Sequence, residues 1–208
     1  MAKYGLIGEK LSHSFSKGIH ESFGYYTYDL LPMSKVELDS FLTQKDFNAV
    51  NVTIPYKQTV IPYCDELDES VLKIGAANTI VNHKGWLKAY NTDFYGFIFS
   101  LKYNNISLED KKILILGTGG TSKTVVAVCE SLNAKSIKVV SRHPDETQMT
   151  YDEALLEKDT HVIINATPSG MYPHNEDLPI IIDGFENLEA VVDVIYNPLK
   201  TNLILEAE

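Results

Sequence analysis

Residues 113–128 read ILILGTGGTSKTVVAV, which is an apolar run, a glycine-rich turn and a segment with helical spacing of apolar residues. Gly117 permits a tight turn, and Gly119 and Gly120 lack the Cβ atoms that would keep an anion away from the backbone. The first turn of the following helix offers free N–H groups and a partial positive charge. A strand, a glycine turn and a helix in this order indicate a dinucleotide site, although Ser122 stands where the usual pattern has its third glycine.

The next strand along the chain ends in Ser141, Arg142 and His143. A site that prefers NAD commonly has an acidic residue here, which holds the ribose 2′-hydroxyl. Arg142 could instead hold a 2′-phosphate and stack on adenine. The alternative is a solvated arginine at a strand end, and Glu146 would repel a phosphate if it faced inward. The pattern therefore favours NADP over NAD.

Working outward from this turn, strand patterns alternate with helix patterns along the chain, which predicts an α/β fold with a mainly parallel sheet. We expect residues 1–94 to form one domain and residues 95–208 a Rossmann-like domain. Ser34 is the expected N-cap of the second helix. The expected strands are 4–8, 25–31, 49–54, 79–82, 86–90 (the last two a hairpin), 112–117, 136–142, 161–167 and 190–196, and the expected helices are 13–23, 35–42, 62–74, 94–104 and 121–134.

The composition of the 208-residue chain is that of an ordinary globular protein, with 44% hydrophobic and 22% charged residues. A net charge of −10 gives no general basic surface, so nucleic acid is not an expected partner. Cys64 and Cys129 form no CxxC pair and the histidines show no HExxH spacing, so we expect no disulfide framework and no metal site. We find no signal peptide and no long apolar run, which favours a cytoplasmic protein without membrane contact and leaves the oligomeric state open.

Seven segments occur in one order along nearly the whole chain: LSHSFSKGIH (11–20), NVTIPYK (51–57), GAANT (75–79), NTDFYG (91–96), GTGGTSK (117–123), NATPSGM (165–171) and DVIYNPLKT (193–201). With these segments the sequence resembles the shikimate dehydrogenase family. This resemblance implies a two-domain α/β oxidoreductase that acts on the CH–OH group of donors, with an N-terminal substrate domain and a Rossmann-like NADP-binding domain. The implied reaction is the NADP-dependent, reversible reduction of 3-dehydroshikimate to shikimate, in the biosynthesis of chorismate and the aromatic amino acids.

The resemblance also implies roles for individual residues. Lys57 and Asp93 match the catalytic pair of the family. The positions that match its substrate contacts are Ser12, Ser14, Thr53, Asn78, Asp93 and Tyr196, and those that match its cofactor site are Gly117, Thr118, Gly119, Gly120, Thr121, Ser141, Arg142 and Val194.

The chemistry of such a reaction suits these residue types. Hydride transfer to a ketone builds negative charge on the oxygen, which an ammonium can stabilise and protonate while a carboxylate orients it. Ser12 and Ser14, two residues apart, can present both hydroxyls on one side of an extended turn to hold the substrate carboxylate. Taken alone, Lys57 also fits a solvated lysine after a strand edge, and Asp93 also fits an ordinary helix N-terminus.

The sequence departs from the family at three places. Lys17 and Glu21 replace the usual proline and asparagine around the first helix, and Ser141 and His143 flank Arg142 where the family has Asn and Thr. After residues 193–201 the family continues with further helices that complete the first domain, so we expect exposed apolar surface, lower stability, self-association and weak activity. The alternatives are a quinate/shikimate dehydrogenase that uses NAD, a non-catalytic module that binds shikimate or NADP, and a plain Rossmann-like interaction domain.

Overall fold

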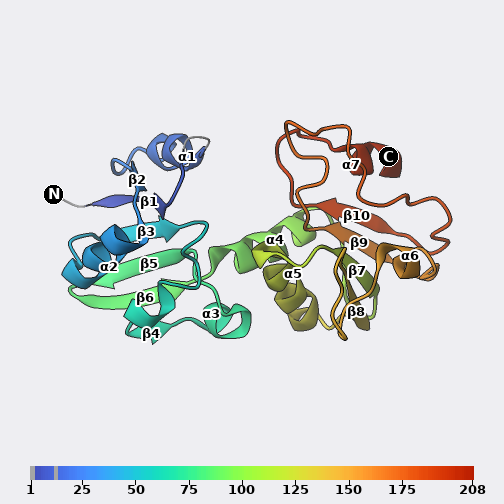
Figure 1. Ribbon diagram of the computed structural model, residues 1–208, viewed down its shortest axis with the longest axis horizontal. Helices are drawn as coiled ribbons and strands as arrows, with labels where there is room; N and C mark the ends of the chain where they lie inside the picture. The colour runs from blue at the N-terminus through green and yellow to red at the C-terminus, as the bar shows by residue number, and fades with distance from the viewer. Residues whose placement is uncertain (1–2, 12–13) are drawn as a thin grey trace. The chain divides into compact units, whose positions relative to one another are not determined.

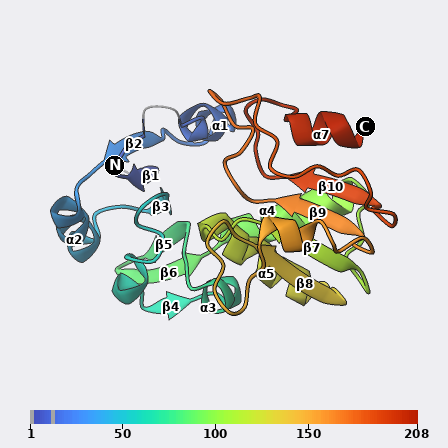
Figure 2. The same cartoon turned by 45° about the vertical axis from the view of Figure 1, so that its right-hand side comes forward.

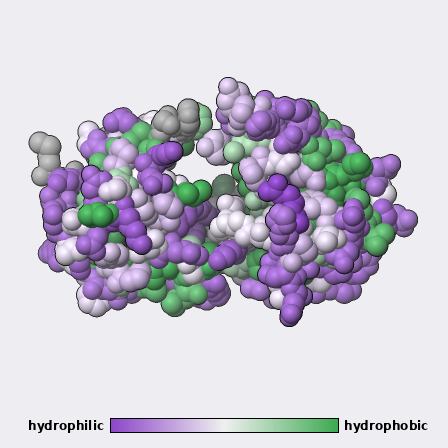
Figure 3. All heavy atoms as spheres, in the orientation of Figure 1, coloured by the Kyte–Doolittle hydropathy of each residue, from purple (hydrophilic) through white to green (hydrophobic). Residues whose placement is uncertain are grey.

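The computed structural model describes residues 3–11 and 14–208, and the chain divides into two compact units, Met1–Tyr95 (unit 1) and Gly96–Glu208 (unit 2). Figure 1 shows that each unit has its own sheet. The surface of each unit is mainly hydrophilic, with smaller hydrophobic areas, on the face drawn in Figure 3. No helix within the described ranges is long and apolar enough to cross a bilayer.

Unit 1 contains a mixed six-stranded sheet with the strand order β2-β1-β3-β5-β6-β4. The pairs β1–β2, β1–β3 and β4–β6 are parallel, whereas β3–β5 and the hairpin β5–β6 are antiparallel. Its elements are β1 (Tyr4–Gly8), α1 (Ser16–Ser22), β2 (Asp29–Pro32), α2 (Lys35–Gln44), β3 (Ala49–Val52), the 3₁₀ turn η1 (Ile61–Tyr63), β4 (Glu66–Leu67), α3 (Glu69–Ile74), β5 (Thr79–His83) and β6 (Trp86–Tyr90); α4 (Thr92–Tyr103) runs across the division between the units.

The core of unit 1 follows from the alternation of side chains along the strands. Ile7 of β1 points to the face covered by α2 and α3, where it packs with Leu38, Leu42 and Val71. The preceding residue, Leu6, points to the other face and packs with Leu11 and Tyr28. The expected N-cap Ser34 is confirmed: it forms a capping box with Glu37 at the start of α2.

Two of the expected elements in unit 1 are wrong. The strand expected at 25–31 is the shorter β2, because the residues before it form an aromatic cluster in which Tyr26 packs against Tyr4, while Tyr25 is 89% exposed. The single helix expected at 62–74 is instead η1, β4 and α3. Asp65 accepts a hydrogen bond from the backbone N–H of Leu87, which ties this segment to β6, and Asp68 caps the separate helix α3.

Unit 2 contains a four-stranded sheet, all parallel, with the order β10-β9-β7-β8, which can be followed from strand to strand in Figure 2. Leu114 and Leu116 of β7 pack on one face with residues of α6, α7 and the connection before β10. Ile113 and Ile115 point to the opposite face, and α5 packs against β7 and β8. The elements are β7 (Lys112–Leu116), α5 (Gly120–Ser131), β8 (Ser136–Val140), α6 (Tyr151–Ala154), β9 (Val162–Asn165), β10 (Ala190–Asp193) and α7 (Asn202–Ala207).

The order of the four strands places β8 on one side of β7 and β9 on the other. This arrangement makes the carboxyl end of β7 a topological switch point, where ligands of open α/β sheets bind. Each strand of unit 2 ends earlier than the sequence predicts, and the polar residues that follow β7, β8 and β9 therefore lie in loops at this edge.

Candidate functional site

Lys57 and Asp93 form an ion pair in unit 1, with 2.7 Å between the Lys57 Nζ and the Asp93 Oδ2. The two side chains are 32% and 48% exposed, so the ammonium remains open to a ligand while it donates to the carboxylate. The structure thus brings together the two residues that the sequence assigns to catalysis.

The backbone around Lys57 is fixed from both sides. The preceding residue, Tyr56, is buried and its hydroxyl donates to the carbonyl of Met33 at 2.7 Å. The carbonyl of Lys57 accepts from the N–H of Ala77 at 2.7 Å, and the N–H of Tyr56 donates to the carbonyl of Thr53. A tight turn after β3 therefore carries the lysine, whose backbone has little freedom to move.

Asp93 lies in the first turn of α4, and the side chain of Asn78 holds the start of that helix. The Asn78 Oδ1 accepts from the backbone N–H of Thr92 at 2.8 Å and from the hydroxyls of Thr92 and Thr79, both at 3.1 Å. The amide nitrogen of Asn78 takes no part in these bonds. Asn78 is 7% exposed and lies within reach of the same helix end that carries Asp93.

A hydrogen-bonded series continues from Asn78 into the sheet. Asn51 donates through Nδ2 to the Thr79 hydroxyl at 3.0 Å and accepts through Oδ1 from the Tyr28 hydroxyl at 2.7 Å. Burial raises the pKa of Tyr28, and the ring of His20 stacks on it with 4.1 Å between the centroids. Burial also lowers the pKa of His20. Asn51 also donates through Nδ2 to the backbone carbonyl of Asn78 at 3.4 Å, so these groups tie Asn78 to the sheet.

The other substrate positions assigned from the sequence are distributed over both units. Thr53 follows β3 and its N–H donates to the carbonyl of Ile7. The Ser14 hydroxyl accepts from the N–H of Ser16 at 3.2 Å, and Ser12 lies outside the described residues. Tyr196 belongs to unit 2, where it follows β10 and is 67% exposed.

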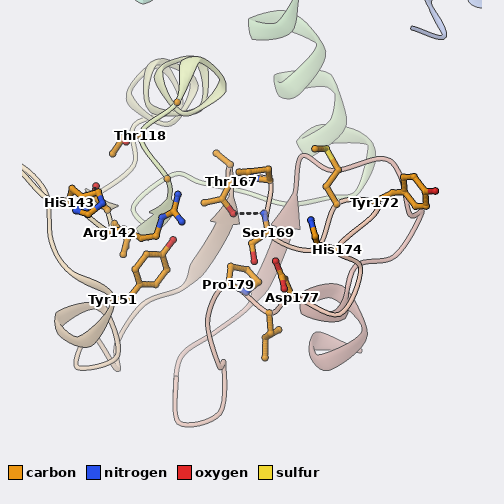
Figure 4. A pocket seen from close by; sticks show the side chains of 18 of the residues that line it. Thr118, Arg142, His143, Tyr151, Thr167, Ser169, Tyr172, His174, Asp177 and Pro179 are labelled. Carbon is orange, nitrogen blue, oxygen red and sulfur yellow. Dashed lines mark hydrogen bonds between the residues drawn. The ribbon is translucent and has the colours of Figure 1, made fainter. Parts of the chain in front are cut away.

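A cavity of about 750 Å³ lies at the carboxyl edge of the sheet in unit 2. It is lined by the residues that follow β7, β8 and β9, together with Tyr151 and the segment 171–179. Figure 4 shows side chains from these separate loops pointing into it. Of the assigned cofactor residues, those in the lining are Gly117, Thr118, Gly119, Ser141 and Arg142, whereas Gly120, Thr121 and Val194 are not part of it.

The glycine turn leaves open space beside the backbone at the start of α5. Gly117 adopts φ +100°, and a Cβ at this position would meet the Thr167 Cγ2 at 2.7 Å. A Cβ on Gly119 or Gly120 would meet no heavy atom within 4 Å, so open space lies beside the backbone where α5 begins. Ser122 in place of the third glycine is buried on the side of α5 that faces the protein. The turn, the N-terminus of the 12-residue helix and the Arg142 cation together fit a pyrophosphate and a further phosphate.

The loop after β9 is held by Asn165, which is fully buried. Its Oδ1 accepts from the N–H and the hydroxyl of Thr167, and its Nδ2 donates to Asp193 at 3.1 Å. Asp193 in turn accepts from the hydroxyl of Thr201 at 2.7 Å. These bonds fix the loop of the NATPSGM segment as one wall of the cavity. None of these residues was assigned to the site from the sequence, although the segment itself was singled out.

Tyr151, Tyr172, His174 and Asp177 also line the cavity and were missed. They come from a short helix and an irregular connection that carry no recognisable pattern. Within the described residues, no group of three His, Cys, Asp or Glu side chains could hold a metal ion, and Cys64 and Cys129 are free thiols.

The parallel sheet, its switch point and the cavity at that edge place unit 2 in the Rossmann-like class of α/β folds. Residues 6–80 match the family model of the shikimate dehydrogenase substrate binding domain. The NADP(+)-dependent shikimate dehydrogenase of Clostridium beijerinckii is 37% identical, over 98% of this chain and 82% of the relative. That of Methanosphaera stadtmanae is also 37% identical, over 98% and 81%.

Solved structures agree with these relatives. A chorismate mutase/shikimate 5-dehydrogenase fusion protein from Clostridium acetobutylicum superposes with a TM-score of 0.90 at 33% identity, over 100% of this chain and 82% of the other. The shikimate 5-dehydrogenase of Thermus thermophilus, in complex with NADP(H) and shikimate, gives 0.86 at 27% identity, over 100% and 84%. The chain belongs to the shikimate dehydrogenase family, a family of oxidoreductases.

Proposed function

We propose that this chain is an NADP-dependent shikimate dehydrogenase, which catalyses the reversible reduction of 3-dehydroshikimate to shikimate. The observation that carries the proposal is the Lys57–Asp93 pair, with its 2.7 Å contact between ammonium and carboxylate, in a chain of this family. The names of the relatives and the ligands of the Thermus structure support the same substrate and cofactor.

The two ligands are assigned to different parts of the chain. Residues 1–94 provide every assigned substrate contact except Tyr196, which agrees with the substrate-binding family model over residues 6–80. Residues 95–208 hold NADP, because the cavity with the glycine turn and Arg142 lies there. NADPH supplies the hydride when it is bound.

Lys57 and Asp93 manage the proton. As negative charge develops on the carbonyl oxygen, the Lys57 ammonium stabilises that charge and donates its proton to the oxygen. In the direction of oxidation, Lys57 accepts the proton of the substrate hydroxyl. Asp93 accepts a hydrogen bond from the ammonium and keeps it oriented, and Asp93 is itself fixed because Asn78 holds the first turn of α4.

Neutral groups recognise the remainder of the substrate. Ser12 and Ser14 bind its carboxylate, and Thr53, Asn78 and Tyr196 bind its hydroxyls. Asn78 does this through its amide nitrogen, since its Oδ1 is occupied at the start of α4. In unit 2, residues 117–121 with the start of α5 bind the pyrophosphate, Ser141 and Arg142 bind the 2′-phosphate, and Val194 contacts the nicotinamide.

The first test measures NADPH formation from shikimate and NADP+ with the wild-type chain and with Lys57→Ala. The expected result is turnover that requires shikimate and falls by roughly 10²–10⁴-fold in the variant. The matched control is Lys45→Ala, because Lys45 is also 32% exposed and pairs with a carboxylate, Asp65, at 3.2 Å. This control should keep wild-type turnover.

Quinate and NAD+ serve as comparison substrates in the same assay. A higher kcat/KM with quinate and NAD+ would replace the proposal by a quinate/shikimate dehydrogenase. Binding of NADP+ and shikimate without any turnover would instead define a non-catalytic binding module. Equal turnover in the wild type and in Lys57→Ala would remove the assigned role of the lysine.

A further inference from the structure

We propose that Tyr151 is a positioning residue for Arg142: it holds the guanidinium toward the cavity of unit 2 and thereby sets the preference for a cofactor with a 2′-phosphate. This inference rests on the proposed function, because it concerns the cofactor site of the same enzyme. It assigns a role to a side chain that the chemistry of hydride and proton transfer does not use.

The backbone fixes the positions of the two residues relative to each other. The segment after β8 leaves the sheet at Ser141 and returns beside the strand at Met149. The N–H of Ser141 donates to the carbonyl of Met149 at 2.9 Å, and the N–H of Met149 donates to the carbonyl of Val139 at 3.0 Å. Arg142 directly follows Ser141, the donor of the first bond, and Tyr151 lies two residues after Met149, the donor of the second. The loop therefore closes with both side chains at the same rim of the cavity.

The turn between them is itself well ordered by side-chain hydrogen bonds. Asp145 accepts from the N–H of Thr147 at 2.9 Å and from the side chains of Thr147 and Gln148. The Ser141 hydroxyl accepts from the N–H of His143 at 3.1 Å. These bonds hold the length and shape of the loop, so the separation of Arg142 from Tyr151 does not depend on either side chain alone.

Tyr151 has a direction fixed by its own element. It is the first residue of α6, and Thr150 and Glu153 form a capping box around that helix start. The tyrosine ring packs against the core cluster that contains Leu116 and Val140. A ring held in this way has few rotamers available, and its polar end faces the cavity that it lines.

Arg142 has no comparable support from its own segment. Its side chain is exposed, and a free arginine side chain loses rotamer entropy when it is fixed. Figure 4 shows the Tyr151 hydroxyl directed toward the guanidinium end of Arg142, with Thr118 and His143 on the same side of the cavity. Burial raises the pKa of Tyr151, and the positive charge of Arg142 opposes that rise, which agrees with the two groups being neighbours.

The consequence is specific to one part of the cofactor. NADP and NAD share adenine, both riboses, the pyrophosphate and the nicotinamide, and differ only in the 2′-phosphate. If Tyr151 acts through Arg142, loss of its hydroxyl weakens NADP+ binding and leaves NAD+ binding unchanged. A tyrosine that contacted adenine itself would weaken both, and a tyrosine that only packed against the core would change neither.

The experiment measures the dissociation constants of NADP+ and NAD+ by calorimetry for the wild-type chain and for Tyr151→Phe, which keeps the packed ring. We expect the Kd of NADP+ to rise by roughly 3- to 10-fold and that of NAD+ to stay within about twofold, since the hydroxyl that faces the Arg142 guanidinium is removed. Adenosine 2′,5′-bisphosphate, which carries the distinguishing phosphate without the nicotinamide, should show the same loss as NADP+. An equal loss for both cofactors, or no change for either, would overturn the inference.

Two further variants sharpen the test. In an Arg142→Ala background the additional Tyr151→Phe change should leave the NADP+ affinity unaltered, because a positioning residue has no effect once the group it positions is gone. Tyr172→Phe is the matched control, since Figure 4 places Tyr172 in the same cavity but at the far side from Arg142, and it should leave the NADP+/NAD+ ratio unchanged. If the wild-type chain binds neither cofactor nor the bisphosphate, the proposed cofactor site itself fails, which is a different result from a failed Tyr151→Phe.

Discussion

At the scale of single residues, Lys57 and Asp93 form a contact that adds little to stability, whereas the role proposed for it is chemical. Both side chains are partly open to solvent, at 32% and 48% exposure, and pairs of this kind stabilise proteins by about 0–1 kcal/mol. The surrounding bonds to Tyr56, Ala77 and Asn78 are better buried and carry the fold locally. The pair can therefore be changed with little damage to its supports.

The Asp93→Asn substitution removes the negative charge beside the Lys57 ammonium. We expect kcat for shikimate oxidation to fall by roughly 10- to 100-fold, because the ammonium loses the charge that orients it. The free energy of unfolding should change by less than about 1 kcal/mol. Steady-state kinetics and urea unfolding of the same preparation check both parts. A variant that lost stability and activity in proportion would show that Asp93 acts as a structural residue of α4.

Replacement of glycine by alanine should have opposite effects on stability at Gly117 and at Gly120. Gly117→Ala places a Cβ 2.7 Å from the Thr167 Cγ2 on a residue with φ +100°, so we expect a loss of about 1–3 kcal/mol in stability. Gly120→Ala meets no atom within 4 Å in the first turn of α5, and should keep or slightly raise the stability. Its Cβ would nevertheless obstruct a pyrophosphate at the helix start, which should raise the Kd of NADP+ by about tenfold or more.

Thermal unfolding and NADP+ titration of the two variants decide this prediction. If Gly120→Ala bound NADP+ as tightly as the wild type, the pyrophosphate would not lie against the first turn of α5, and the assignment of residues 117–121 would need to be revised.

At the scale of secondary-structure elements, the sequence predicts strands best in the middle and worst at their ends. The apolar centres of β7, β8 and β9 stand out by composition, and all three were expected within two residues of their observed bounds. Their ends were placed too late because the polar residues that follow, such as Ser141 and Thr167, also fit a strand pattern. In the structure these residues leave the ladder and bond to neighbouring loops, as Thr167 does to Asn165.

Elements set by long-range contacts were the ones that the sequence could not predict. The helical spacing at 62–74 is real, but Asp65 binds the N–H of Leu87, 22 residues away, and divides the segment. The role of Tyr151 has the same origin, because it depends on the return of the chain at Met149 rather than on any local pattern. The residues that matched family motifs were identified, whereas the residues that support them were not.

Asn78 joins three elements, so its substitution tests how these elements are held together. Asn78→Ala removes the acceptor at the start of α4 and should cost about 1–2 kcal/mol of stability as well as shikimate affinity. Asn78→Asp keeps an acceptor, which the helix N-terminus favours, and should lose less than half as much stability. Both variants lack the amide donor, so we expect the KM for shikimate to rise about tenfold in each.

Urea unfolding of the two variants measures how much Asn78 stabilises the start of α4. Steady-state kinetics with shikimate measures its contact with the substrate. Wild-type KM in Asn78→Asp would show that the amide nitrogen does not contact the substrate, and would leave Asn78 with the helix start alone.

At the scale of the whole molecule, an acidic chain is assigned two anionic ligands. The net charge of −10 repels both a carboxylate substrate and a phosphate-bearing cofactor at long range, so their binding depends on a few local donors. Unit 1 offers Lys57 and the serine and threonine hydroxyls, and unit 2 offers Arg142 and the free N–H groups at the start of α5. Apart from Tyr196, which lies in unit 2, the donors assigned to the substrate therefore lie in unit 1, and those assigned to the cofactor lie in unit 2.

This separation predicts that each ligand, added alone, protects a different set of amides from hydrogen exchange. NADP+ should slow exchange at residues 117–121 and 141–143, and shikimate should slow it at 53–57 and 91–93, because a ligand at about 100 times its Kd stabilises its bound state by about 2.7 kcal/mol. Mass spectrometry of peptides from the intact chain resolves these segments. Helix α2, which lies in unit 1 and contains none of the assigned donors, serves as an internal control and should be unaffected by NADP+. If NADP+ alone protected residues 53–57 as strongly as shikimate does, the assignment would be contradicted. The segment that carries Lys57 would then respond to the cofactor, and the two binding sites would not be independent.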